Sequence, residues 1–261
     1  MSASQPVLWH ISISHFNEKA RWALDFKRVS HRRRAIPGGF HMLAALALTR
    51  GAGLTFPILV LDGEAIGDST AIIGALERHH PEPALYPEDP SERRRALDLE
   101  DYFDEELGPA IRLLGWHELT RDPARLTTLM DQFVPPSLRE TKVALELSAR
   151  FASTFTGLRY GVKSEEAAER SRQKVVAALD RLEAEIGGKE YLVGDRFSVA
   201  DLTAAALFYP LVLPPEGPEL GDPTEAFQRF REPLQDRPGY RWVGEIYRRH
   251  RAPAPVAAPV A

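Results

Sequence analysis

Three short segments of this chain lie directly before a predicted helix or strand and could contact a ligand, and the first of them contains Ser14. A hydroxyl at a helix N-terminus can donate a hydrogen bond to a sulfur anion, and the helix dipole adds positive potential there. A free thiol has a pKa of about 8.5, and about 1.4 to 3 kcal/mol of thiolate stabilisation lowers it by one to two units. The position of Ser14 therefore predicts that its hydroxyl activates a thiol. A plain helix cap, the role favoured for an isolated serine, is the alternative.

The second segment is the pair Phe56-Pro57, which directly precedes a predicted strand. A cis peptide bond at such a position can expose backbone N–H and C=O groups to an extended peptide ligand. The alternative is that Pro57 simply begins an edge strand. The sequence leaves both interpretations open.

The third segment is Asp68-Ser69, which directly precedes a predicted helix. Backbone N–H groups at a helix start attract a carboxylate, and the Ser69 hydroxyl adds a donor. Asp68 can pair with an ammonium group, so the two residues together suit the free amino acid end of a ligand. An ordinary N-cap after a glycine turn is the alternative.

The composition excludes several classes of chemistry. The chain has no cysteine, so any reactive thiol must come from a ligand, and disulfides and thiolate metal sites are ruled out. No two of its eight histidines have the H-x-x-x-H spacing, and we expect no metal site. The net charge of −4 argues against a nucleic-acid partner. We expect a cytoplasmic protein that does not contact membranes, because the chain shows no signal peptide and no long apolar run.

The N-terminal part of the sequence predicts the order βαβ, an irregular helix, then ββα. Residues 7–11 read as a strand, 15–28 as an amphipathic helix and 32–36 as a weak edge strand. Asp62-Gly63 lies between two apolar runs and favours a hairpin turn with positive φ at both residues. A helix over about 70–79 should bury Ile72, Ile73 and Leu76.

A proline-rich segment, 81–90, divides the chain into an expected N-terminal domain over 1–80 and an all-α domain over 91–251. Gly108-Pro109 should kink the first helix of the second domain. The tail 252–261 contains only Ala, Pro and Val and should be disordered. The expected helices of the second domain are 91–120, 123–133, 137–157, 165–186, 198–209, 224–234 and 239–250.

Taken together, these motifs resemble the cytosolic glutathione transferases over residues 7–250, and among them the serine-type, bacterial-like enzymes. The first similarity is the pattern Ser14-His15-Phe16-x-x-Lys19-Ala20-Arg21-x-Ala23-Leu24. The second is Phe56-Pro57-Ile58-Leu59 followed by Ile66-Gly67-Asp68-Ser69-Thr70-Ala71. The third is Ser198-x-x-Asp201, which looks like a capping box in the helical domain. The resemblance implies a thioredoxin-like N-terminal domain that binds glutathione and an all-α C-terminal domain that supplies a hydrophobic pocket.

The resemblance also implies roles for the residues of the three segments. Ser14 corresponds to the hydroxyl that stabilises the glutathione thiolate. Phe56, beside a cis Pro57, corresponds to the backbone contact with the cysteinyl unit, and Asp68 with Ser69 to the γ-glutamyl end.

Other candidates are less firmly placed by the resemblance. For the glycine carboxylate of glutathione they are His41 and Arg50. The electrophile pocket is expected along the 91–120 helix, and its candidates are Tyr102, Phe103, Glu106 and Trp116.

The sequence departs from the family pattern at two places. His15 replaces the usual proline, and the segment 38–53 is long and unusually apolar. No tyrosine occupies position 9 or 10, which excludes a tyrosine-type enzyme, and Asn17 stands where redox-type relatives can carry a second cysteine. The lack of cysteine argues against the glutaredoxin-like branch.

The predicted function is therefore a detoxifying glutathione transferase that acts on a small hydrophobic electrophile, with glutathione as co-substrate and a homodimer implied by the resemblance. Glutathione-dependent isomerisation, dehalogenation and peroxide reduction would use the same residues, and another low-molecular-weight thiol could replace glutathione. The competing hypothesis is a non-catalytic binding protein built on the same fold, because a fold does not by itself determine a function.

Overall fold

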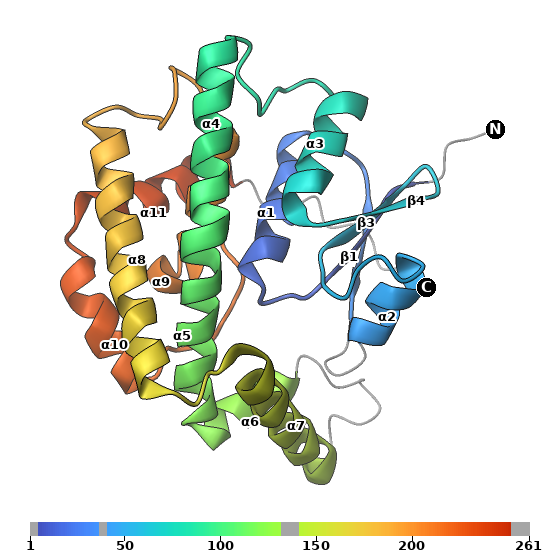
Figure 1. Ribbon diagram of the computed structural model, residues 1–261, viewed down its shortest axis with the longest axis vertical. Coiled ribbons are helices and arrows are strands. Elements are labelled where there is room, and N and C mark those ends of the chain that lie inside the picture. Colours follow the sequence, from blue (N-terminus) through green and yellow to red (C-terminus); the bar gives the residue numbers. More distant parts are fainter. Residues whose placement is uncertain (1–4, 37–40, 132–140, 252–261) are drawn as a thin grey trace.

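The computed structural model describes residues 5–36, 41–131 and 141–251. A four-stranded sheet with its helices forms one half of the molecule, and helices alone form the other (Figure 1). Residues 38–40 of the apolar segment and the whole tail 252–261 lie outside the described residues. No helix of the described part is long and apolar enough to cross a membrane.

The first half has the predicted order of elements. Its elements are β1 (Val7–His10), α1 (His15–Phe26), β2 (Arg32–Ala35), α2 (His41–Leu48), β3 (Ile58–Leu61), β4 (Glu64–Gly67) and α3 (Ser69–His79). The sheet order is β2-β1-β3-β4, with β2 parallel to β1 and β3 antiparallel to both of its neighbours. The prediction that 32–36 forms an edge strand is confirmed. The predicted hairpin turn is also confirmed, because Asp62 has φ 49° and Gly63 has φ 86°.

The two faces of this sheet pack against different helices. Leu8 and Leu59 share one face and lie in the main core with Ile72, Ile73 and Leu76, the residues predicted to be buried on α3. Alternation along the strands turns Ile58 to the other face, where it packs with Phe56 and Ala45 of α2. In Figure 1, α1 and α3 accordingly lie between the sheet and the helical half, and α2 lies on the outer side.

The second half is entirely helical. It comprises α4 (Pro90–Tyr102), α5 (Gly108–Thr120), α6 (Pro123–Asp131), α7 (Lys142–Tyr160), α8 (Glu165–Ile186), α9 (Val199–Val212), α10 (Glu225–Arg231) and α11 (Pro238–His250). The bounds of α8 match the prediction, because Ser164 caps its first turn and Gly187 ends it with φ 48°. Helix α7 begins at 142 and extends to 160, whereas 137–140 of the predicted helix lies outside the described residues.

The predicted single helix over 91–120 is interrupted. A π-helical turn over Phe103–Leu107 separates α4 from α5, and Pro109 lies in the first turn of α5. Proline has no backbone N–H, so the regular ladder cannot continue through this position. The sequence predicted a kink at Gly108-Pro109, and the structure has a π-helical turn directly before this pair.

Helix α9 is the centre of the helical half and packs against α1, α4, α5 and α11. Its predicted capping box is confirmed, because the Ser198 backbone N–H donates to Asp201 Oδ2 at 2.8 Å. Asp201 Oδ1 also accepts the Leu192 N–H at 2.8 Å, and burial raises the pKa of the Asp201 carboxyl to about 6. The contact of α9 with α1 joins the two halves of the molecule.

Candidate functional site

The loop between β1 and α1 places Ser14 at the first turn of α1. The Ser14 backbone is extended, with φ −82° and ψ 127°, and its N–H donates to the Ile11 carbonyl at 3.2 Å. Its Oγ accepts the Asn17 backbone N–H at 3.5 Å, so Ser14 is the N-cap of α1, as the alternative interpretation stated. The Ser14 hydroxyl proton is used by no hydrogen bond within the described part of the chain. The side chain is half-buried, and it can therefore cap α1 and still donate to a ligand.

The fully buried Asn17 connects this loop to the segment before β3. Its Nδ2 donates to Ser14 Oγ at 2.8 Å and to the Phe56 carbonyl at 3.1 Å. Its Oδ1 accepts the Ile11 N–H at 3.0 Å. Sequence reasoning treated Asn17 only as the absence of a second cysteine. An asparagine three residues after a serine N-cap was the sequence signal that could have indicated this contact with Ser14.

The Phe56-Pro57 peptide bond is cis, and β3 is a central strand of the sheet, so Pro57 does not begin an edge strand. Phe56 and Pro57 are buried, and Phe56 packs against α2. The backbone that precedes β3 lies beside Asn17 and Ser14, and the peptide-binding role of Phe56 and Pro57 stays a prediction.

Asp68 lies at the start of α3 with an unusual backbone conformation, φ 73°. Its Oδ1 accepts the Thr70 N–H at 2.7 Å and the Ala71 N–H at 3.4 Å, which is the N-cap role that the sequence left as the alternative. The carboxylate is otherwise exposed, and Ser69 beside it is buried. The cap leaves Asp68 Oδ2 and the Ser69 hydroxyl as the groups that a ligand could meet.

A buried ionic cluster lies directly behind this segment. Lys19 Nζ contacts Glu100 at 2.7 Å and Asp104 at 2.5 Å, and it donates to Thr70 Oγ1 at 2.9 Å. Burial raises the pKa of the Glu100 carboxyl, and Lys19 opposes that shift. Glu100 of α4 is fully buried, because Lys19 of α1 and the Thr70 hydroxyl of α3 both contact its carboxylate.

Arg21 of the first motif holds the loop in place. It donates to the Ile11 carbonyl at 3.2 Å and to the Ser12 carbonyl at 3.0 Å, and so ties α1 to the end of β1. Arg21 also contacts His10 Nδ1 at 3.0 Å. Burial, with Arg21 as a secondary cause, lowers the pKa of His10 to about 3, so this imidazole is neutral.

His15, the departure from the family pattern, joins the two halves of the molecule. Its Nε2 lies 3.0 Å from the Gly108 carbonyl, and burial lowers the pKa of the imidazole to about 3. Because the neutral ring must donate to a carbonyl oxygen, Nε2 carries the proton. This contact gives His15 a structural role between the two halves of the molecule.

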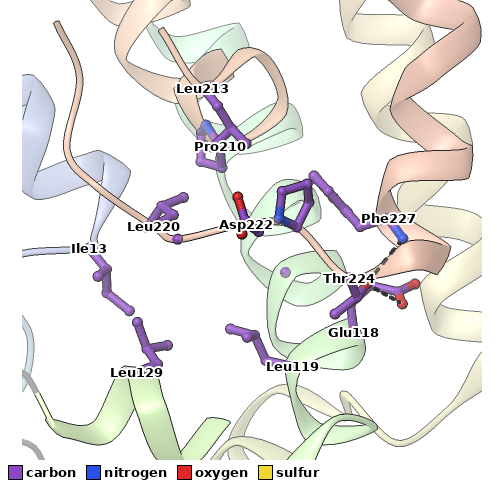
Figure 2. Close-up of a pocket in the computed structure, with 13 residues that line it drawn as sticks. Ile13, Glu118, Leu119, Leu129, Pro210, Leu213, Leu220, Asp222, Thr224 and Phe227 are labelled. Carbon is purple, nitrogen blue, oxygen red and sulfur yellow. Dashed lines mark hydrogen bonds between the residues drawn. The ribbon is translucent and has the colours of Figure 1, made fainter. Parts of the chain in front are cut away.

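A pocket of about 90 Å³ lies beside the loop, where Ile13 faces α5, α6 and the end of α9 (Figure 2). Glu118 lies at its edge, accepts the Thr224 hydroxyl at 3.4 Å and pairs with Arg172 at 3.3 Å. Most of the lining is apolar, and it includes Leu119, Leu129, Pro210, Leu213, Leu220 and Phe227.

Of the four residues predicted to line the pocket, three lie elsewhere in the helical half and the fourth lies close to the pocket. Phe103 is fully buried against Phe208, Tyr102 stacks under Arg181, and Glu106 pairs with Lys174 at 2.8 Å. These three do not line the pocket, because the apolar stripe of α4 and the π turn packs into the core with α8 and α9.

Trp116 is the fourth predicted pocket residue. It packs in a cluster that includes Ile11, Ile13 and Leu129, and the last two also line the pocket. Trp116 thus lies on the side of α5 that faces the Ser14 loop.

The candidates for the glycine end lie at the two ends of α2. His41 is half-buried, and burial lowers its pKa. Arg50 is exposed with φ 53°. Helix α2 packs on the Phe56 side of the sheet, so both remain predictions for a ligand that extends past Phe56. Among the residues that the structure describes, no cluster of His, Asp and Glu is arranged to hold a metal ion.

Comparison with known proteins matches both halves of the chain to one family. The N-terminal domain model of glutathione S-transferases matches residues 8–84, and the C-terminal domain model matches residues 124–238. No curated protein matches the sequence.

Solved structures share the fold at low sequence identity. The β-etherase LigF from Sphingobium sp. strain SYK-6 is 20% identical, with TM-score 0.61 over 93% of this chain and 99% of its own. Glutathione transferase GSTFuA3 from Phanerochaete chrysosporium is 18% identical, with TM-score 0.62 over 95% and 97%. A glutathione S-transferase from Methylobacterium radiotolerans, in complex with glutathione sulfonate, is 19% identical, with TM-score 0.55 over 99% and 98%.

Proposed function

Because the chain belongs to the glutathione S-transferase family and is thus a glutathione transferase, we propose that Ser14 activates the glutathione sulfur for attack on a compact hydrophobic electrophile. The observation that carries this proposal is the Ser14 hydroxyl. Its oxygen accepts two hydrogen bonds from Asn17, and its proton is left for a ligand.

Ser14 acts as a hydrogen-bond donor and keeps its own proton throughout. When glutathione binds, its thiol supplies the nucleophile and loses its proton to solvent. The Ser14 O–H and the positive end of α1 then stabilise the negative sulfur. One hydrogen bond to a charged group contributes about 1.5 to 3 kcal/mol, which corresponds to a thiol pKa lowered by about one to two units.

The remaining parts of the tripeptide have candidate partners in the segment before β3, at the start of α3 and at the ends of α2. Phe56, held by the cis bond to Pro57, offers its backbone N–H to the cysteinyl unit. Asp68 Oδ2 suits the ammonium of the γ-glutamyl end, and the Ser69 hydroxyl suits its carboxylate. His41 and Arg50 stay as candidates for the glycine carboxylate.

The electrophile is proposed to enter the apolar pocket beside Ile13. A cavity of about 150 Å³ holds benzene, so the 90 Å³ found here suits a smaller apolar group. In conjugation, the sulfur forms a bond to carbon while the leaving group departs with its electron pair. Proximity of the two reactants adds to the effect of the lowered thiol pKa.

The test is Ser14→Ala, with Ser12→Ala as a matched control in the same loop. The Ser12 backbone carbonyl carries the contact with Arg21, so the control keeps that bond. Glutathione affinity is measured by titration calorimetry, and the pKa of the bound thiol by ultraviolet thiolate absorbance. We expect Ser14→Ala to bind glutathione with a thiol pKa raised toward about 8.5 and to lose turnover, while Ser12→Ala behaves as wild type. An unchanged thiol pKa in Ser14→Ala would contradict the proposal.

A homodimer and a cytoplasmic location complete the proposal, and both rest on the family resemblance. Light scattering on the purified protein measures the first. A monomer at micromolar concentration would remove the dimer from the proposal without affecting the role of Ser14.

A further inference from the structure

The amide of Asn17 makes three hydrogen bonds to three different parts of the candidate site. Its two N–H groups donate to Ser14 Oγ and to the Phe56 carbonyl, and its oxygen accepts from the Ile11 N–H. The side chain is fully buried, so no solvent competes for these bonds.

The orientation of the amide follows from its neighbours. The Ile11 N–H can only donate and the Phe56 carbonyl can only accept, so the oxygen must face Ile11 and the nitrogen must face Phe56. The second N–H of that nitrogen is then directed at Ser14 Oγ, at 2.8 Å. A flipped amide would place two donors together at Ile11 and two acceptors together at Phe56.

This geometry limits what Ser14 can do. A hydroxyl has one donor and two acceptor sites, and Asn17 occupies both acceptor sites through its Nδ2 and its backbone N–H. The single remaining interaction of Ser14 is donation of its own proton. Donors that point into an oxygen also polarise its O–H and strengthen the bond that it donates.

We propose that Asn17 is a positioning residue that holds the Ser14 hydroxyl as a hydrogen-bond donor toward the ligand sulfur and locks it to the Phe56 backbone. The inference rests on the proposed function and adds a role for a side chain that never touches the ligand. It also gives a reason for asparagine at this position. The side chain must supply two donors and one acceptor in one plane, and an amide of this length does so.

The charged side chains near the loop bind other groups and do not contact the Ser14 hydroxyl. Arg21 binds the carbonyls of Ile11 and Ser12, and Glu18 and Arg251 pair behind it. The neutral His10 accepts from Arg21. Removal of the Asn17 amide therefore leaves the charge of the loop unchanged.

The experiment compares the bound-thiol pKa in Asn17→Ala, Asn17→Asp, Ser14→Ala and the double variant Ser14→Ala/Asn17→Ala. Loss of one polarising bond should raise the thiol pKa by about one unit in Asn17→Ala. Asn17→Asp keeps the acceptor for Ile11, but its carboxylate accepts the Ser14 proton and adds a negative charge near the sulfur, so it should raise the thiol pKa at least as much as Ser14→Ala. The double variant should show no shift beyond that of Ser14→Ala, because Asn17 acts through Ser14.

Ser198→Ala is the control for a purely structural effect. It removes a hydroxyl from the capping box of α9, so it should lower stability without changing the thiol pKa. If Asn17→Ala does not fold, Asn17→Asp provides the same test. A wild-type thiol pKa in either Asn17 variant, or a further shift in the double variant, would overturn the inference while the role of Ser14 stands. Failure of wild type to bind glutathione would instead overturn the proposed function itself.

Discussion

Replacing Gly108 by alanine should weaken the contact between the two halves of the molecule. Gly108 begins α5 directly after the π turn, and a Cβ built on it would lie 2.4 Å from Cζ of the Phe16 ring. Ordinary contacts between carbon atoms are about 3.5 to 4.0 Å long, so the ring would have to move by more than 1 Å. Phe16 is held between His15 and Arg112, at ring distances of 4.5 and 5.7 Å.

The expected change in the free energy of unfolding of Gly108→Ala has two opposing contributions. Overpacking of this kind costs about 1 to 3 kcal/mol, and alanine in a helix gains about 1 kcal/mol over glycine. Gly244→Ala in α11 isolates the second term, since its Cβ would meet no atom within 4 Å. The difference between the two variants is then the overpacking cost alone, and we expect Gly244→Ala to be the more stable by about 1 to 3 kcal/mol.

The assay is urea unfolding of both variants and of wild type, followed by circular dichroism. Adding Phe16→Leu to Gly108→Ala should recover part of the loss, because the smaller side chain leaves room for the methyl group. Equal stability of Gly108→Ala and Gly244→Ala would refute the reasoning. It would mean that the Phe16 ring moves aside at no cost and that the close approach of α1 to α5 does not hold the two halves together.

The remaining predictions concern acid stability and the pocket. The pKa of His15 is lowered from about 6.5 in the unfolded chain to about 3, so its contribution to stability is complete above pH 6.5 and is lost as pH falls toward 3. Between pH 8 and pH 5 wild type should lose about 2 kcal/mol more than His15→Gln, and parallel pH curves from urea unfolding would contradict this. Gly115→Ala adds a methyl group that meets no atom within 4 Å at the pocket wall. It should stabilise α5 by about 0.5 to 1 kcal/mol and raise KM for a compact electrophile without changing the thiol pKa of bound glutathione, and an unchanged KM would place the electrophile elsewhere.

Features with a local physical cause were predictable from the sequence alone. The Asp62-Gly63 turn, the Ser198 capping box and both ends of α8 depend on backbone preferences within a few residues. The position of Ser14 at a helix start is of the same kind, because a strand, a short polar loop and an amphipathic helix follow one another in the sequence. The order of elements and the family resemblance rest on such signals.

Contacts between distant parts of the chain were decided only by the tertiary structure. Asn17 meets Phe56, His15 meets Gly108, and the Tyr209 hydroxyl donates to the Ile13 carbonyl at 2.5 Å. These pairs depend on how α1, α5 and α9 pack, and hydrophobic periodicity gives the buried face of a helix but not its neighbour.

The pocket illustrates the same limit. Its predicted residues came from the 91–120 helix, but Phe103 fills the core, and the lining comes from α5 at the end of that helix together with the Ser14 loop, α6 and the segment after α9. The sequence by itself determined which group could activate a thiol, because a helix N-terminus is a local feature. The partners of that group and the space beside it were set by packing, because burial energy depends on total apolar contact and does not specify which surfaces meet.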